Sequence, residues 1–270
     1  MRPGAHGLLL IGFAALAALM LWPLPLHLSS HVLEAIYHWD AYTNTMLMTA
    51  RVNGMLGTGP GLYESYFFAP IPNSIVFNEN LFGLSLLYAP VYLITKHPLL
   101  SYNVTLLASL ALSQYFTCLL VRRVSGSALA GILGGFAFAL SPYVTFELGR
   151  IQLVATQWIP LCLLFMLRAF ESGRRRDIAG MCFSYVLQVG TCLYYAVFLL
   201  PLLSLAAVVL AVHRRPGTRF FRRVIAAGIL ATLRTVVQFI DDGIVVTHQV
   251  GANVLFVLEI HFVIVARTLV

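Results

Sequence analysis

Long apolar runs separated by short polar segments predict helices that cross a membrane. The runs over residues 8–26, 100–121, 128–143 and 178–212 carry almost no charged side chains. An α-helix needs about 20 apolar residues to cross the hydrocarbon core, so the pattern predicts an all-α membrane protein with about eight transmembrane helices. We expect these spans at residues 8–26, 100–121, 127–143, 157–170, in two halves of 178–212 divided near residues 191–195, and at 224–240 and 243–265.

The composition agrees with a membrane protein. The positive net charge raises nucleic-acid binding as an alternative, which the placement of the basic residues weakens. Apolar residues make up 60% of the chain and charged residues only 10%, against about 45–50% and about 25% in soluble proteins. The formal net charge of +7 is, on its own, compatible with nucleic-acid binding. The basic residues, however, fall in short clusters beside apolar runs, as topology signals do. We therefore expect membrane lipids, and no nucleic acid, as partners.

The arginines predict the orientation of the chain, because basic residues gather on the cytoplasmic side. Three short clusters lie beside apolar runs: 122–123, 168 with 174–176, and 214–223. If the run 81–95 crossed the membrane, the first two clusters would face outside. That run has only about 15 residues and contains Pro90, so it is short for a span. Treated as a helix at the outer interface, it leaves all three clusters and the N-terminus in the cytoplasm.

Residues 27–99 then form one large extracytoplasmic loop, whereas the other connections are short. Loops of this length are usually functional or disordered. This one is rich in Trp, Tyr, Phe, Pro and Asn, a composition that favours folding against the membrane surface over disorder. The orientation places these acidic residues outside: Glu34, Asp40, Glu64, Glu79, Glu147, Asp241 and Asp242. We therefore expect the functional surface on the extracytoplasmic face.

A helix with two different faces is expected over about residues 38–53 of this loop. One face carries Asp40, Asn44, Leu47 and Arg51. The other face, which suits the headgroup region of a bilayer, carries Ile36, Trp39, Thr43, Met46 and Ala50. The first face would direct Asp40 and Asn44 toward an enclosed polar site. For Asp40, a helix-start carboxylate that only interacts with the helix dipole is an equal alternative.

Glu79 stands between Asn78 and Asn80 at the start of 81–95, after a segment rich in proline and aromatic residues that forces turns. A carboxylate and two amides at this point can bind a polar ligand. They can equally cap the helix that follows. Both interpretations stay open from the sequence.

The outer connection between the third and fourth spans carries Glu147, Arg150 and Gln152. Arg150 is one of few basic residues on the outer side, where its guanidinium can bind a lipid phosphate. It can equally anchor the chain at the interface or pair with Glu147. Tyr194 and Tyr195, at the outer turn between the fifth and sixth spans, are expected to belong to an aromatic belt.

Several short motifs follow one another along the chain. They are Asp40, Phe67-Phe68-Ala69-Pro70, Asn78-Glu79-Asn80-Leu81-Phe82-Gly83, Ser141-Pro142-Tyr143, Gln152 and Gln157-Trp158-Ile159-Pro160-Leu161. In order and spacing, over residues 8–212, these motifs resemble the bacterial polytopic glycosyltransferases of the GT-C fold. The likeness is to a group with a Gly-Asp start, a Phe-Tyr-Pro segment and a Ser/Asn-Glu-x-x-x-Gly turn in the first outer loop. That group continues with Ser-Pro-Tyr, Gln and Gln-Trp-x-Pro-Leu. The resemblance implies interfacial helices in this loop and a location in the bacterial cytoplasmic membrane.

The resemblance also implies transfer of a sugar from a polyprenyl-phosphate-linked donor to an acceptor at the extracytoplasmic face. Inverting transfer needs a carboxylate that takes the acceptor proton and a cation that steadies the leaving phosphate. On this basis Asp40 is the expected base, Glu79 a second catalytic carboxylate that orients the acceptor or a metal, and Arg150 a phosphate contact. The remaining expected substrate-binding residues are Asn44, Asn80 and Gln152. Metal use varies in this fold, so a divalent cation is left undecided, and no other cofactor is expected.

Two departures keep other functions open. Where the family commonly carries histidines after Ser-Pro-Tyr, this chain has Glu147 and Arg150. Relatives are usually much longer, and residues 213–270 diverge from the pattern, with Arg234 and Glu259 inside expected spans where charges are unfavourable. The alternatives are an inactive truncated relative or a non-catalytic polytopic protein, such as a lipid or solute transporter or an envelope-assembly partner. In each case we expect one polytopic membrane domain over residues 1–270.

Overall fold

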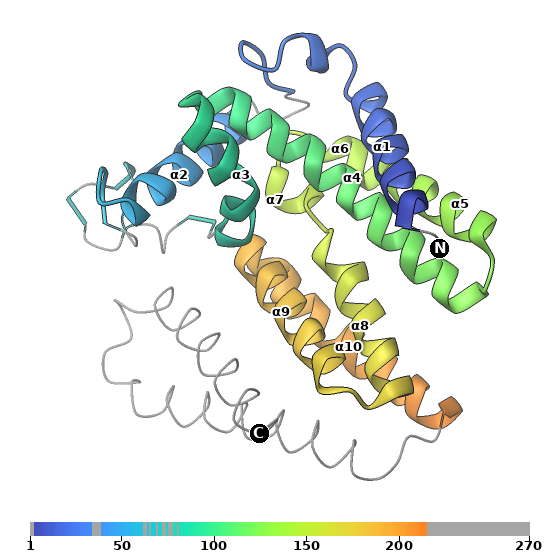
Figure 1. Ribbon diagram of the computed structural model, residues 1–270. Coiled ribbons are helices and arrows are strands. Elements are labelled where there is room, and N and C mark those ends of the chain that lie inside the picture. The colour runs from blue at the N-terminus through green and yellow to red at the C-terminus, as the bar shows by residue number, and fades with distance from the viewer. Residues whose placement is uncertain are drawn as a thin grey trace, which may run out of the picture.

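The chain folds as a set of helices joined by short turns. A computed structural model describes residues 3–33, 39–61, 64, 66–68, 70–71, 74, 78–79 and 81–214. These described residues contain no strand, so the all-α prediction is confirmed for them. The helices are α1 (Pro3–Met20), η1 (Leu24–Leu26), α2 (Asp40–Met55), α3 (Phe82–Thr95), α4 (Pro98–Ser125), α5 (Ala128–Ala139), α6 (Pro142–Phe146), α7 (Ile151–Val154), α8 (Trp158–Ser172), α9 (Arg175–Thr191) and α10 (Leu193–Arg214) (Figure 1).

Four stretches of the described chain are long and apolar enough to cross a membrane. They are Pro98–Ser125 (α4), Ala128–Phe146 (α5 with α6), Ile151–Ser172 (α7 with α8) and Leu193–Val212 in α10. They overlap the second, third, fourth and sixth predicted spans. Helices of this length and composition indicate a multi-pass membrane protein.

Four of the eight predicted spans therefore correspond to helices of membrane-crossing length and composition, and the number eight stays a prediction. The apolar part of α1, Gly4–Met20, falls among the shorter helices. The fifth predicted span corresponds to α9, which has 17 residues and begins with Arg175, Arg176 and Asp177. The long apolar run divides as predicted, at Cys192, whose extended backbone (φ −152°, ψ 123°) separates α9 from α10. The last two predicted spans lie outside the described residues.

Helix α3 agrees with the expectation that the run 81–95 is not a span. It has 14 residues, short of the about 20 that a span requires. Its first turn lies against the end of α9, and Gly83 makes this possible. A Cβ at Gly83 would lie 2.2 Å from the Leu187 carbonyl oxygen and 2.3 Å from Thr191 Oγ1. The glycine of the Asn-Glu-x-x-x-Gly motif therefore permits a close contact between two helices.

Two tight turns at one end of the bundle bring the first two arginine clusters together. Gly126 ends α4 and Gly173 ends α8, each with a left-handed backbone (φ 73° and 63°) that glycine adopts without a Cβ penalty. The chain then reverses into α5 and α9. An ion pair between Arg123 and Glu171 joins the two turns. Both arginine clusters therefore lie at the same end of the bundle, as expected if they share one side of a membrane (Figure 1).

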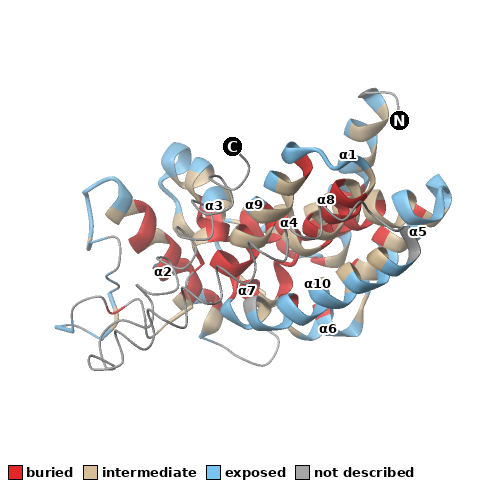
Figure 2. Cartoon of the chain, turned by 90° about the horizontal axis from the view of Figure 1, so that it is seen from below, coloured by how far each residue is buried: buried red, intermediate tan, exposed pale blue. Residues whose placement is uncertain are grey.

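The buried core gathers around the first half of α4, away from these turns. It is built from buried apolar side chains of five segments, such as Leu21, Leu47, Leu84, Leu106 and Ile151. Figure 2 contrasts these buried segments, in red, with α5 and α10, which expose much of their surface. The exposed side chains of α5 and α10 are largely apolar, as in helices that face lipid. The core fixes α2 and α7, which carry Asp40, Asn44 and Gln152, on the bundle together with α3.

Candidate functional site

The face of α2 that was expected to line a site packs against the rest of the protein. Asn44, Leu47 and Arg51 are buried, whereas Trp39 is 78% exposed and Met46 is also exposed. The two faces predicted for this helix are therefore confirmed for these residues, whereas Thr43 of the expected outward face is half-buried and Ile36 lies outside the described residues. The outward face begins with a large aromatic side chain, which suits the interfacial position expected for it.

One residue of the outward face was placed wrongly. Ala50, expected to lie with Trp39 and Met46, is fully buried. The Thr49 hydroxyl lies 2.6 Å from the Tyr88 hydroxyl of α3, so α3 covers this part of α2 as well. The protein-facing side of α2 is wider in its second half than helical spacing alone predicts.

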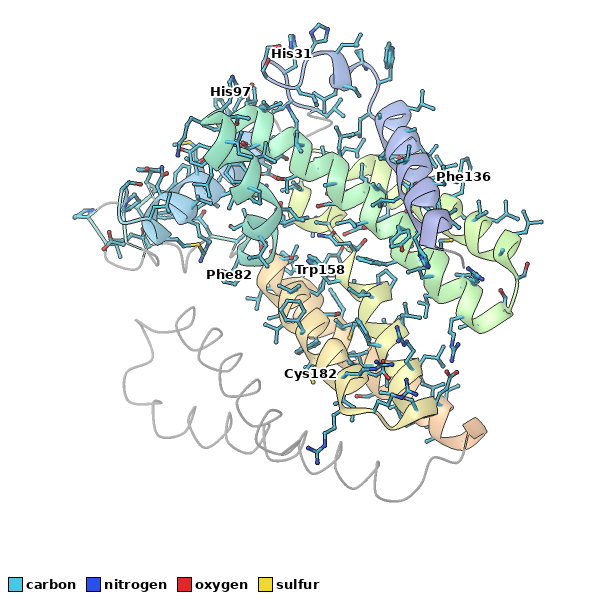
Figure 3. The ribbon with its side chains drawn as sticks, in the orientation of Figure 1. His31, Phe82, His97, Phe136, Trp158 and Cys182 are labelled. Atoms are coloured by element: carbon cyan, nitrogen blue, oxygen red, sulfur yellow. The ribbon has the colours of Figure 1, made fainter. Side chains whose placement is uncertain are left out.

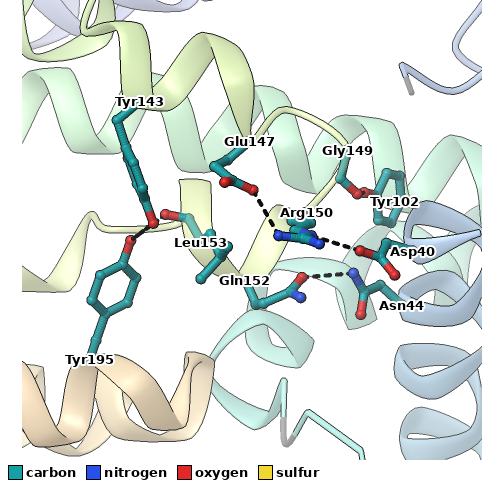
Figure 4. Close-up of polar contacts among 10 residues, drawn as sticks. All are labelled: Asp40, Asn44, Tyr102, Tyr143, Glu147, Gly149, Arg150, Gln152, Leu153 and Tyr195. Carbon is teal, nitrogen blue, oxygen red and sulfur yellow. Dashed lines mark hydrogen bonds and ion pairs between the residues drawn. The ribbon is translucent and has the colours of Figure 1, made fainter. Parts of the chain in front are cut away.

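An ion-pair cluster of three residues joins the start of α2 to the connection between α6 and α7 (Figure 4). Arg150 Nε donates to Asp40 Oδ2 at 2.8 Å, and Arg150 Nη1 donates to Glu147 Oε2 at 3.4 Å. The side chains stay partly accessible, with 39% of Asp40, 26% of Arg150 and 21% of Glu147 exposed. Two carboxylates around one guanidinium leave one negative charge uncompensated among these three groups. A polar ligand can therefore reach a charged surface here.

An amide pair lies next to the ion pairs. Asn44 Nδ2 donates to Gln152 Oε1 at 2.7 Å, and both side chains are buried. The Tyr102 hydroxyl of α4 donates to the Gly149 carbonyl oxygen at 3.5 Å and holds the same connection from the bundle side (Figure 4). The structure thus brings together four of the predicted site residues: Asp40, Asn44, Arg150 and Gln152.

The local sequence explains how α6 and α7 present these side chains. Ser141 caps α6 with its hydroxyl, and Pro142 occupies the first turn. Glu147 ends α6 and Arg150 precedes α7, so the two charged residues stand three positions apart on one turn. Asp40 is the first residue of α2, at the positive end of the helix dipole. The dipole interaction of Asp40 and its pairing with Arg150 are therefore present together.

Glu79 lies against the start of α10, whereas Asp40 pairs with Arg150 of the α6–α7 connection. Its carboxylate accepts a hydrogen bond from the backbone of Leu193. Burial raises the pKa of Glu79 above its ordinary value, and this hydrogen bond opposes part of the shift. The N-cap residue of α3 is Leu81, whose side chain makes no capping bond, so Glu79 meets α10 instead of capping α3. The adjacent Asn80 lies outside the described residues.

Tyr195 has a more specific contact than the aromatic belt expected for it. Its hydroxyl donates to the Leu153 carbonyl oxygen at 2.5 Å and lies 3.1 Å from the Tyr143 hydroxyl (Figure 4). This contact ties the first turn of α10 to α6 and α7. The belt prediction fits the neighbouring Tyr194, which is exposed. The Ser-Pro-Tyr motif was a signal for Tyr143, but spacing could not identify a partner 52 residues away.

Arg51 is a buried cation that the sequence placed on the correct face of α2 without assigning it to the site. Its side chain is 1% exposed, and its guanidinium carbon lies 5.8 Å from the centre of the Phe82 ring, which Figure 3 labels. A cation–π contact of this kind stabilises a charge that has lost part of its hydration. Arg51 thereby links α2 to the first turn of α3.

Neither metal ligands nor relatives identify the chemistry of the ion-pair cluster. Within the described part of the chain, no group of three or more His, Cys, Asp and Glu side chains is placed to hold a metal ion. Comparisons with protein-family models, curated proteins and solved structures find no match for this chain. A function must therefore be argued from the helical fold, the membrane-length helices and the polar contacts themselves.

Proposed function

We propose that the protein is a membrane glycosyltransferase that moves a sugar from a polyprenyl-phosphate-linked donor to an acceptor at the extracytoplasmic face. The observation that supports this proposal is the meeting of Asp40 with Arg150 and of Asn44 with Gln152. The two pairs join residues 110 and 108 positions apart. These are residues to which the resemblance to GT-C enzymes gives the roles of base, phosphate contact and substrate contacts. Helical periodicity within one segment does not produce such a meeting, so it favours a site built from two segments.

The chemistry divides between the two charged partners. The acceptor oxygen attacks the anomeric carbon, and the bond from that carbon to the phosphate oxygen breaks with its electron pair on the polyprenyl phosphate. Asp40 takes the proton of the acceptor hydroxyl. Arg150 carries donors in a planar fork that matches phosphate oxygens, so it can stabilise the charge that develops on the leaving group.

The contact between Asp40 and Arg150 gives Glu147 a supporting part in this scheme. When the guanidinium turns toward a phosphate, Glu147 still holds one of its nitrogens, at 3.4 Å in this structure. Asp40 then loses a charged partner at the moment when it must bind a proton. A carboxylate is a better base without an adjacent cation, because the cation favours the ionised form. Glu147 is thus a positioning residue for Arg150.

Glu79 is the second carboxylate of the proposal, with a role separate from that of Asp40. Its raised pKa favours the neutral carboxyl, which can donate a hydrogen bond as well as accept one. We assign Glu79 to positioning the acceptor from the side of α10. Asn80, Asn44 and Gln152 complete the substrate contacts expected from the motifs.

The sidedness of the membrane is part of the same proposal. The first two arginine clusters lie at one end of the bundle, and the ion-pair cluster of Asp40, Glu147 and Arg150 lies near the other end (Figure 1). Basic residues concentrate on the cytoplasmic side of multi-pass proteins. The candidate site would then face outside, and the N-terminus would lie in the cytoplasm of a bacterial cell.

One observation favours a second candidate, a non-catalytic polytopic membrane protein. The guanidinium of Arg150 contacts both neighbouring carboxylates. A purely structural contact that holds α2 against the α6–α7 connection would have the same geometry. A transporter or an envelope-assembly partner would need this tie and no base. Loss of the Asp40 carboxylate would then change stability without changing any transfer reaction.

The test is sugar transfer by the purified full chain, with polyprenyl-phosphate-linked sugars labelled in the sugar. Asp40→Asn keeps the size of the side chain and an oxygen that accepts from Arg150, but it cannot take a proton. We expect transfer to fall by at least about 100-fold. Glu64→Gln is the matched control, because it removes an exposed carboxylate from the same loop, where Glu64 accepts from the Gly61 N–H at 3.4 Å.

Two outcomes contradict the proposal in different ways. Unchanged transfer in Asp40→Asn excludes Asp40 as the base. No transfer by the wild-type chain with any labelled donor, together with solute uptake into proteoliposomes without a donor, favours the non-catalytic candidate.

A further inference from the structure

Five arginines form a charged surface at the end of the bundle far from the candidate site. We call this surface the arginine end, and its members are Arg122, Arg123, Arg174, Arg175 and Arg176. The first two lie in the last turn of α4. The other three lie at the start of α9, directly after the turn that ends α8. The ion pair between Arg123 and Glu171 brings the two groups side by side.

The carboxylates of this region do not neutralise the arginine end. Glu171 pairs with Arg123. Asp177, in the first turn of α9, is buried. Its Oδ1 forms an ion pair with Arg168 Nε at 3.2 Å, and its Oδ2 accepts from the Ser172 hydroxyl at 2.7 Å. In the described part of the chain, no carboxylate forms an ion pair with Arg122 or with the triplet at 174–176. As far as the described residues go, four of the five cations therefore have no ion-pair partner and can bind an external anion.

The length of α4 places this surface at the level of lipid headgroups. Its 28 residues give a helix about 42 Å long, which exceeds the about 30 Å of the hydrocarbon core. Arg122 and Arg123 therefore lie beyond the hydrocarbon when α4 crosses the membrane. Side chains at this level meet lipid phosphates before any soluble anion.

Apolar surface adjoins the charged one. Val124, Leu129 and Leu133 are exposed near the turn between α4 and α5. A soluble phosphate compound has no apolar part that could contact such a surface, whereas a phospholipid presents a phosphate and acyl chains together. The neighbouring positions of arginines and exposed aliphatic side chains match both parts of a lipid molecule.

We propose that the arginine end binds the headgroups of anionic phospholipids, with the acyl chains lying along α5. The guanidinium groups of Arg122, Arg174, Arg175 and Arg176 bind the headgroup phosphates, for which their planar fork is suited. The site is independent of the proposed sugar transfer, since it shares no residue with the ion-pair cluster of Asp40, Glu147 and Arg150.

The experiment measures binding of fluorescent phosphatidylglycerol and phosphatidylcholine to the purified full chain in neutral micelles. The variant Arg174→Gln/Arg175→Gln/Arg176→Gln removes the triplet, and Arg174→Lys/Arg175→Lys/Arg176→Lys keeps its charge and reports on folding. Each arginine lost should weaken phosphatidylglycerol binding about fivefold, and the lysine variant should keep most of it. Binding of phosphatidylcholine should be weaker and unchanged by either variant.

A single substitution protects the test against a triple variant that fails to fold. Arg122→Gln should weaken phosphatidylglycerol binding about fivefold. Lys96→Gln is its matched control, because Lys96 is an exposed cation at the opposite end of α4, beyond α3. Equal binding of the two lipids, equal effects of Arg122→Gln and Lys96→Gln, or displacement of the lipid by millimolar inorganic phosphate would each overturn the proposal.

Discussion

The two ends of the helical bundle carry their charges in different ways. At the candidate site, Arg150 is partly buried between Asp40 and Glu147, and the contact to Asp40 joins residues 110 positions apart. At the arginine end, the cations are neighbours in sequence, largely exposed and mostly without carboxylate partners among the described residues. The first arrangement defines a geometry between segments, whereas the second defines a charged surface.

The two ends show two different roles of charged side chains in a membrane protein. A guanidinium held by two carboxylates fixes the position of the elements that carry them, and so prepares a site for directional chemistry. Exposed like charges beside an apolar surface act instead through the sum of their fields and need no fixed geometry. Exchange of charges should therefore be damaging at the candidate site and mild at the arginine end.

The largest effect is expected from exchanging the charges of the site. Asp40→Arg alone opposes two guanidinium groups and should destabilise the chain. Adding Arg150→Asp restores the pair between positions 40 and 150 and part of the thermal stability, although Glu147 then faces a carboxylate at position 150. The exchange also moves the carboxylate away from the acceptor. We expect sugar transfer to stay at least about 100-fold below the wild type in the double variant.

The corresponding exchange at the other end is the control. Arg123→Glu with Glu171→Arg reverses a partly exposed ion pair far from the site and should leave sugar transfer unchanged. Recovery of transfer in the Asp40→Arg/Arg150→Asp variant would mean that the pair serves only to hold α2. The two ends would then differ only in how much their ion pairs contribute to the stability of the chain.

A second prediction concerns the glycines that shape the two ends. Gly83→Ala places a methyl group 2.2 Å from the Leu187 carbonyl oxygen, and backbone cannot move aside easily. We expect a loss of about 3 kcal/mol, or roughly 8 °C in the unfolding midpoint. Gly173→Ala meets no atom within 4 Å and is opposed only by the positive φ of 63°, so it should lose about 1 kcal/mol. Equal losses in thermal unfolding would show that α3 does not depend on close contact with α9.

The helical pattern made much of the fold predictable. Apolar runs located four membrane-length stretches and the division at Cys192, because helix length and hydrocarbon thickness are fixed quantities. The two faces of α2 followed from a spacing of 3.6 residues per turn. The burial of Ala50 did not, since it depends on α3, which reaches α2 from a different part of the chain.

The site was predictable as a set of residues and less so as a set of contacts. Charge and position singled out Asp40 and Arg150, and Glu147 was considered as a partner of Arg150. The bond from Arg150 to Asp40 could not be derived, because an ion pair between distant segments leaves no periodic trace in the sequence. For Glu79, the nearest helix in sequence was α3, but the backbone contact is with α10.

A third prediction concerns the pH dependence of stability. Burial raises the pKa of Glu79 in the folded chain above the ordinary value of 4.5. The folded chain therefore holds this proton more tightly than the unfolded chain. The stability that comes from the neutral carboxyl is full below about pH 4.5 and is lost as the pH rises through the folded pKa.

Glu79→Gln cannot ionise and should keep this stability at all pH values. The unfolding midpoint of the variant should rise relative to the wild type as the pH increases from about 4 to about 8. Glu64→Gln, at an exposed carboxylate of the same loop, should give a curve parallel to that of the wild type. A constant difference between Glu79→Gln and the wild type would contradict the burial of a neutral carboxyl at α10.

The smallest effect on stability is expected at the arginine end, where it separates folding from lipid binding. The Arg123 side chain is 51% exposed, so its ion pair with Glu171 should contribute less than about 1 kcal/mol. Arg123→Gln and Glu171→Gln should therefore have similar unfolding midpoints. Their effects on phosphatidylglycerol binding should have opposite signs, because one variant removes a positive charge beside the binding arginines and the other removes a negative charge there. Weaker binding in both variants would mean that the ion pair positions the surface rather than competing with the lipid phosphate.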